Sequence, residues 1–192
     1  SCADDMEKYL KFLLNKTLIN GELILSNKTF EYIFEPHIII GDSFYPTQKL
    51  TKPNWKTYGL GWFQHDYRGQ KVDLHTGSLQ GLVAIIGLIR DKNIGVHVFS
   101  NLDNAELRHA IIYKVFDLLV FDDNTRDWNN EIFKLYKKYR DESINKYLNK
   151  FKERVLNTSP TLKIKSYLGI YSHLMYGDIV VSLNKNKLNI DV

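Results

Sequence analysis

The stretch that most constrains the fold is the apolar run Leu82-Val83-Ala84-Ile85-Ile86-Gly87-Leu88-Ile89, in which polar and apolar residues do not alternate. A strand of this composition is typical of a sheet that is covered on both faces. The run is far shorter than the roughly 20 apolar residues that cross a bilayer, and it ends at Arg90. We therefore predict a strand inside a layered domain, with helices supplying the cover.

Further segments with strand character surround this run. They are residues 58–63, 71–77 and 94–100, with turns predicted at 66–69 and 91–93. Because short turns join neighbouring strands that run in opposite directions, the sheet is predicted to be antiparallel.

Three segments carry apolar residues at helical spacing, and they are residues 1–15, 26–34 and 103–119. Ser1, Ser26 and Asp103 stand at their starts and are residue types that cap helices. Residues 37–55 between them lack regularity and are predicted to form a long surface loop, which often borders a site. These patterns predict an α+β fold, an antiparallel sheet covered by helices on both faces.

The rest of the chain predicts a connector and a second, smaller part. Residues 127–155 form a densely charged helical pattern, and Asn157-Thr158-Ser159-Pro160 interrupts it. Strand patterns follow in residues 167–171 and 179–181. We divide the chain into a main domain at 1–122, a helical connector at 123–161 and the start of a small β module at 162–192. Two or three strands are marginally stable alone, so we expect this module to be incomplete.

Composition excludes several classes of protein. The 192 residues have a net charge of +4, which gives only a weak attraction for anions, and the basic cluster at 137–140 is followed by Asp141 and Glu142. Nucleic acid is therefore not an expected partner. The single cysteine, Cys2, cannot form a disulfide framework or a zinc cluster. The histidines do not gather at metal-ligand spacing, and we expect no metal or other cofactor.

The stretch from Val72 to Gly81 has the strongest chemical character. Its alternation places Asp73 and His75 on one face of a strand and the aliphatic residues on the other. Gly77 and Gly81 bracket what we predict to be a short loop offering backbone N–H groups outward. The simplest alternative for His75 is a histidine at a sheet edge that pairs with Asp73 and has no further role.

Several motifs in order carry a resemblance to a known family. They are Tyr58-Gly-Leu-Gly-Trp62, His75-Thr-Gly-Ser78, Gly81, and an apolar strand pair that ends at Ser100-Asn101. This part resembles the last third of the serine β-lactamase and penicillin-binding protein family, in its class C and DD-peptidase-like branch. The opening Ser1-Cys-Ala-Asp-Asp-Met6 is similar to a helix of the same family, and Tyr167-Leu-Gly-Ile-Tyr171 resembles a small β module that some members carry.

The resemblance implies roles for four residues. His75 takes the place of the lysine in the family's Lys-Thr-Gly motif, and with Thr76 and Gly77 it would hold a substrate carboxylate or assist proton movement. The backbone N–H of Ser78 would form half of an oxyanion hole. The catalytic candidates are thus His75 and Ser78, and the substrate-binding candidates are Thr76 and Gly77. The implied substrate is a β-lactam, a D-amino-acid peptide or an ester, and the implied location is extracytoplasmic.

The nucleophile motif of the family is not found at the expected place in this sequence. In the family, Ser-x-x-Lys and Tyr-x-Asn precede the Lys-Thr-Gly strand, and no segment before His75 matches either. Ser143-Ile-Asn-Lys146 and Ser182-Leu-Asn-Lys185 match later, and we interpret both as accidental. We therefore expect a C-terminal fragment of a serine hydrolase that is inactive alone. The alternative is a non-catalytic protein that recognises cell-wall peptide or a protein partner. The sequence indicates neither the substrate nor the oligomeric state.

Overall fold

The computed structural model describes residues 2–17, 20–41 and 45–191. The chain separates into two compact units, Ser1–Ile144 and Asn145–Val192, which are described one at a time. No helix within the described ranges is long and apolar enough to span a bilayer.

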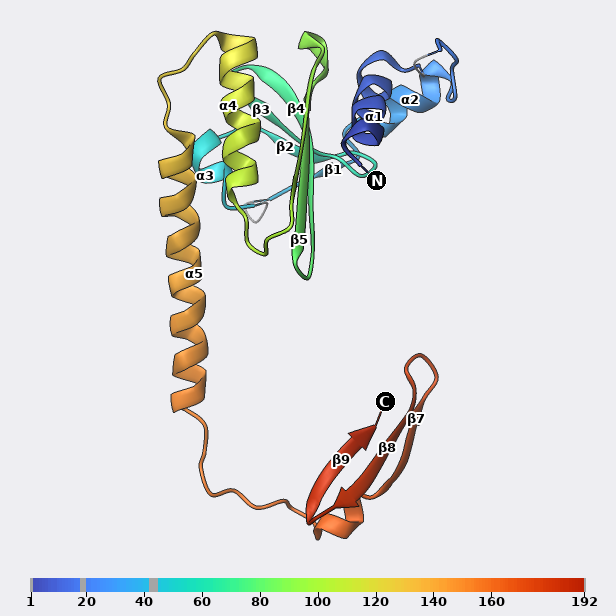
Figure 1. Ribbon diagram of the computed structural model, residues 1–192, viewed down its shortest axis with the longest axis vertical. Helices are drawn as coiled ribbons and strands as arrows, with labels where there is room; N and C mark the ends of the chain where they lie inside the picture. The colour runs from blue at the N-terminus through green and yellow to red at the C-terminus, as the bar shows by residue number, and fades with distance from the viewer. Residues whose placement is uncertain (1, 18–19, 42–44, 192) are drawn as a thin grey trace. The chain divides into compact units, whose positions relative to one another are not determined.

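Unit 1 contains a sheet of six strands that follow one another in chain order (Figure 1). All neighbours are antiparallel, as the short turns predict. The strands are β1 (Ile38–Ile39), β2 (Lys56–Tyr58), β3 (Phe63–Tyr67), β4 (Gln70–Leu79), β5 (Leu82–Ile89) and β6 (Ile94–Ser100).

Helices lie on both faces of this sheet, which confirms the prediction drawn from the apolar run in β5. Ile85 and Ile89 face a buried cluster that includes α4, while Ile86 and Leu88 face a second cluster built with α1 and α2. The helices of the chain are α1 (Ala3–Asn15), α2 (Asn27–Ile33), α3 (Gln48–Thr51), α4 (Leu107–Phe121) and α5 (Trp128–Lys152), with a short 3₁₀ turn at Arg90–Lys92.

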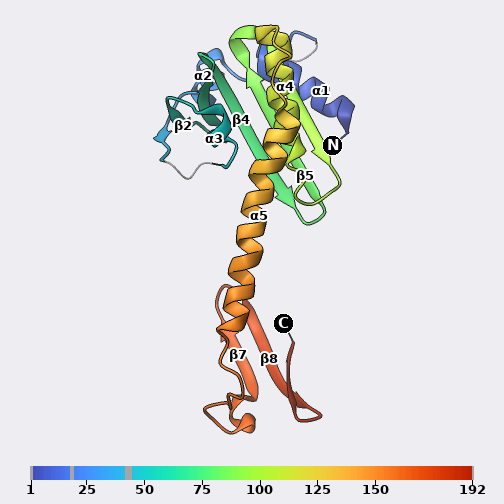
Figure 2. The ribbon, with the colours of Figure 1, turned by 90° about the vertical axis from the view of Figure 1, so that its left-hand side faces the viewer.

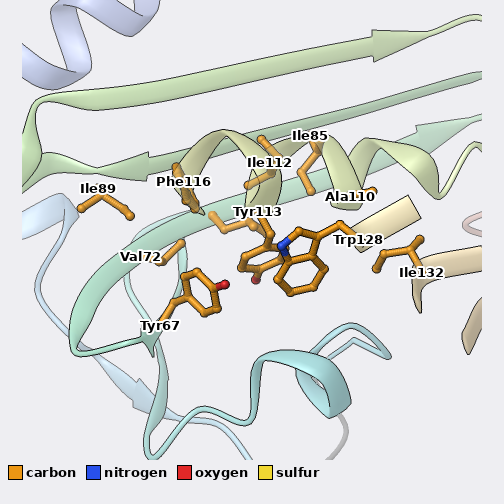
Figure 3. Close-up of a cluster of buried hydrophobic side chains, with 11 residues drawn as sticks. Tyr67, Val72, Ile85, Ile89, Ala110, Ile112, Tyr113, Phe116, Trp128 and Ile132 are labelled. Carbon is orange, nitrogen blue, oxygen red and sulfur yellow. The ribbon is translucent and has the colours of Figure 1, made fainter. Parts of the chain in front are cut away.

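A buried carboxylate joins β3, α4 and the start of α5. Asp117 accepts hydrogen bonds from the Tyr67 hydroxyl and from Trp128 Nε1, both at 2.6 Å. The ring of Trp128 stacks on Tyr113 with centroids 4.8 Å apart, and Figure 3 shows this pair in the centre of the cluster. The start of α5 is therefore part of the core of unit 1.

The helix starts agree with the sequence at one position and differ at another. Ser26 caps α2 as predicted, and its Oγ accepts the N–H of Thr29 at 3.1 Å. Ser1 lies outside the described residues, and Cys2 is the N-cap residue of α1. The prediction for Asp103 was wrong, because α4 begins after Glu106 and Asp103 instead accepts the N–H of Gly81 at 2.7 Å.

The glycines after Tyr58 do not lie in a strand, so the predicted strand at 58–63 was wrong. Residues 59–62 connect β2 to β3, and Gly61 has a φ of +83° that favours glycine. At Gly59 a Cβ atom would lie 2.7 Å from the carbonyl oxygen of Ile33, so the space excludes any side chain. The predicted loop at 37–55 also contains two short elements, β1 and α3.

Unit 2 contains a three-stranded antiparallel sheet (Figure 2). Its strands are β7 (Gly169–His173), β8 (Gly177–Asn184) and β9 (Lys187–Asp191), preceded by a 3₁₀ turn at Ile164–Tyr167. The register places six apolar side chains on one face, namely Tyr171, Ile179, Val181, Leu183, Leu188 and Ile190. None of them is fully buried within the described residues.

Candidate functional site

Half of β4 has an open edge. Strand β3 pairs with β4 only from Gln70 to Leu74, whereas β5 continues to pair as far as Leu79. Among the residues that the structure describes, 75–79 therefore have a strand on one side only. This open segment carries all four residues that the sequence predicts for the site, which are His75, Thr76, Gly77 and Ser78.

The register also fixes which backbone groups face the open edge. A two-residue turn joins Leu79 to Leu82, and such a turn is closed by a hydrogen-bonded pair. Because hydrogen-bonded pairs alternate along an antiparallel ladder, the N–H groups of Thr76 and Ser78 point away from β5. The two-residue turn between Tyr67 and Gln70 leads to the same result for the pairing of β4 with β3. Counted from that turn, the N–H groups of Thr76 and Ser78 again lie on the β3 side of β4, away from β5. The Ser78 N–H thus faces the open edge.

His75 lies in a half-buried aromatic setting. Its Nε2 is 3.3 Å from the Tyr58 hydroxyl, and its ring stacks on Phe63 with centroids 5.4 Å apart. Burial lowers the pKa of His75 below its usual value. The imidazole is therefore mainly neutral at pH 7, so one of its ring nitrogens is free to accept a proton.

Asp73 is not the partner of His75, so the simplest alternative does not describe this histidine. The Asp73 carboxylate accepts the Gln64 side-chain amide at 2.8 Å and lies 3.4 Å from Lys71 Nζ. Burial raises the pKa of Asp73, while Lys71 and Gln64 act in the opposite direction. Asp73 belongs to a buried polar contact between β3 and β4, and Tyr58 takes the position beside His75.

The Thr76 hydroxyl is held inside the protein. It donates to the carbonyl oxygen of Ala84 at 2.9 Å and accepts Arg108 Nε at 3.1 Å. Both of these contacts are on the α4 side of the sheet, because Thr76 alternates with His75 along β4. What Thr76 presents at the open edge is its backbone.

The predicted loop of outward N–H groups was wrong. Strand β4 continues to Leu79, so only Gln80 and Gly81 form the turn, and the Gly81 N–H donates to Asp103. A Cβ atom at Gly77 would meet nothing within 4 Å, so space is open beside the backbone there.

The two Ser-x-x-Lys strings lie in settings unsuited to nucleophilic catalysis. Ser143 and Lys146 are exposed on the surface of α5, and Ser182 and Lys185 lie on β8 and in the turn after it. A lysine activates a serine only where its pKa is lowered by burial or by neighbouring charge. Among the described residues, no three His, Cys, Asp or Glu side chains gather to hold a metal ion.

Sequence patterns did not identify the partners of the predicted residues. Tyr58 and Arg108 contact the site from positions 17 and 32 residues away. The motif Tyr58-Gly-Leu-Gly-Trp62 was the available signal for Tyr58, whereas no local pattern marks Arg108.

No protein-family model matches the chain, and no curated protein matches it. A solved structure of the octameric penicillin-binding protein homologue from Pyrococcus abyssi is similar to it. The similarity covers 99% of this chain and 34% of that chain, with 20% sequence identity and a TM-score of 0.53. This chain therefore spans about a third of the length of that one. At this identity the comparison shows a distant similarity of fold.

Proposed function

We propose that this chain is the C-terminal part of a penicillin-recognising serine hydrolase of the β-lactamase, DD-peptidase or esterase type. Its nucleophile would lie outside residues 1–192. The observation that carries the proposal is the open edge of β4, where the Ser78 N–H faces outward next to His75. The similarity in fold to a penicillin-binding protein homologue supports the same conclusion.

In the proposed reaction, a serine of the parent protein attacks the carbonyl of a β-lactam, D-amino-acid peptide or ester. The Ser78 N–H then donates to the oxyanion, and the N–H of the nucleophile itself supplies the second donor. One such donor is worth roughly 3–4 kcal/mol in a comparable hydrolase. Water finally hydrolyses the acyl-serine ester.

The other three residues act around this donor. His75, neutral and beside Tyr58, assists proton movement as a general acid or base. Thr76 binds the substrate through its backbone at the open edge, in the way that an extended ligand adds to a sheet. Gly77 has no side chain and leaves space for the substrate beside the backbone. Within this proposal, residues 1–122 belong to the hydrolase domain, 123–161 connect it, and 162–192 begin the small β module.

The first test compares the parent protein with this chain. Incubation with a fluorescent penicillin is expected to label the parent and to leave the chain unlabelled. A covalent adduct on Ser143 or Ser182 would contradict the proposal. The coding sequence upstream of Ser1 is expected to contain Ser-x-x-Lys at the start of a helix, and its absence would favour the non-catalytic binding protein instead.

The role of the Ser78 N–H has a sharper test in the parent protein. Ser78→Pro removes this N–H, and a proline is tolerated where the N–H has no strand partner. Acylation by the fluorescent penicillin should fall roughly a hundredfold or more, while the thermal midpoint changes little. Ser78→Ala keeps the N–H and is the matched control. Equal acylation in the two variants would remove Ser78 from the mechanism.

The role of His75 is tested by His75→Ala. General acid–base catalysis contributes about a hundredfold or more, so acylation should fall by that order. His97→Ala, on β6, is the control for loss of a partly buried histidine. An unchanged acylation rate in His75→Ala would count against the assigned role.

A further inference from the structure

An apolar groove lies in unit 1, on the α4 side of the sheet. It is a groove of about 620 Å³ formed by the end of β6, the start of α4 and the first half of α5. Its walls are mainly apolar and include Val98, Leu107, Ile111 and Phe133, the last three of which are exposed. A groove of this size and composition is typical of a binding site for a small organic molecule.

A nearly buried guanidinium forms part of this groove. The side chain of Arg108 is only 7% exposed, its Nε donates to Thr76, and its Nη2 lies 3.3 Å from Glu106 Oε2. The third nitrogen, Nη1, is buried and has no hydrogen-bond partner among the described residues. Buried donors are nearly always satisfied, so an unpaired guanidinium N–H indicates a missing acceptor.

The charge of the groove favours an anion. Arg108 and Arg140 both line it, against the single carboxylate of Glu106. Burial raises the pKa of Glu106, although the neighbouring Arg108 acts in the opposite direction. A planar guanidinium binds a carboxylate through paired, charge-assisted hydrogen bonds.

We propose that this groove binds an anionic amphiphile, namely a carboxylate that carries a single hydrocarbon chain. The carboxylate would accept from Arg108, with Arg140 nearby, and the hydrocarbon chain would lie against Val98, Ile111 and Phe133. Arg108 also donates a hydrogen bond to Thr76. A ligand bound in the groove would therefore change the surroundings of Thr76 at the open edge of β4. The proposal does not require the hydrolase activity, because the residues of the groove are not those assigned to the reaction, although Arg108 links the groove to Thr76.

The probe for this proposal is decanoate, titrated into the chain of residues 1–192 by calorimetry. Decyltrimethylammonium has a chain of the same length with the opposite charge and serves as the comparison. We expect decanoate to bind in a one-to-one ratio and at least about tenfold more tightly, which is the scale of one charge-assisted hydrogen bond. Equal affinities would overturn the proposal, because they would show that the groove does not recognise charge.

Two variants test whether the ligand binds in the groove. Arg108→Gln removes the guanidinium. Phe133→Glu introduces a negative charge at a wall position that is exposed, so we expect this variant to fold. Each should weaken decanoate binding at least about tenfold. Lys138→Gln and Phe151→Ser, on the same helix but outside the groove, are the matched controls. If Arg108→Gln fails to fold, Phe133→Glu decides, and full affinity in it would reject the site.

A nuclear magnetic resonance titration tests the link to β4. Decanoate is expected to shift the amide resonance of Thr76, whose hydroxyl accepts from Arg108. Binding without a shift at Thr76 would refute Arg108 as the partner of the anion.

Discussion

The two sheets of this protein differ in how much of their apolar surface is covered. In unit 1, Ile85 and Leu88 point to opposite faces of β5, and both are almost completely buried. In unit 2, Tyr171 and Ile190 share one face with four other apolar residues and are 51% and 62% exposed. An alternation of apolar residues along a strand is therefore not enough to bury one face of a sheet, because the covering layer has to come from other elements.

The largest expected effect is at Trp128, in the covered part. Trp128→Ala should lower the free energy of unfolding of unit 1 by about 3–5 kcal/mol, because it leaves a cavity and removes a donor from Asp117. Urea unfolding followed by the fluorescence of Trp55 and Trp62 measures this change. Phe151→Ala on the same helix, where the ring is 58% exposed, is the control and should cost under about 0.5 kcal/mol. Similar losses in both variants would contradict the burial of Trp128.

Acid should destabilise unit 1 through two buried histidines. Burial lowers the pKa of His65 to about 4, and burial together with Arg108 lowers that of His109 to about 3. Because the unfolded chain takes up these protons first, near pH 6.5, the stability is complete above that pH and is lost as the pH falls. Each histidine should contribute a loss of about 1.4 kcal/mol per pH unit.

Urea unfolding at several pH values between about 7.5 and 5.5 gives this slope. The variant His109→Gln has one such group fewer, so its slope should be smaller by about half of the histidine contribution. Equal slopes in the two proteins would show that His109 is not held neutral by burial.

A smaller effect is expected at Gly59, where the backbone of two segments meets. A methyl group there would lie 2.7 Å from the Ile33 carbonyl oxygen and 3.0 Å from that of Glu35. Gly59→Ala should cost about 1–3 kcal/mol, as overpacking does. Gly77→Ala, whose Cβ would meet nothing within 4 Å, is the matched control in thermal unfolding. If both variants melt at the same temperature, the close approach at Gly59 is wrong.

The smallest effect is expected on the exposed face of unit 2. Ile190→Ser replaces a side chain that is 62% exposed, so the change in local stability should stay under about 0.5 kcal/mol. Hydrogen exchange at Val181, which lies opposite Ile190 in the register, measures it. A much larger loss would mean that another surface covers this face in solution.

Much of the secondary structure could be predicted because it depends on neighbours in the sequence. The apolar run of β5, the cap at Ser26 and the short turns are local patterns, and the structure confirms them. The strand predicted through Gly59 and Gly61 failed because contacts from residues 33 and 35 require glycine at one of these positions. A pattern within six residues does not contain that information.

The candidate site also has features that local sequence pattern predicts and features that it does not. Local sequence pattern was enough to show that Asp73 and His75 share one face of a strand and that β5 needs cover on both faces, since side-chain alternation is a property of the strand. The hydrogen bonds from Gln64 to Asp73 and from Arg108 to Thr76, and the position of Tyr58 beside His75, became visible in the folded protein alone. The physical reason is that these hydrogen bonds join elements distant in sequence, and their geometry exists only when the sheet and helices have packed.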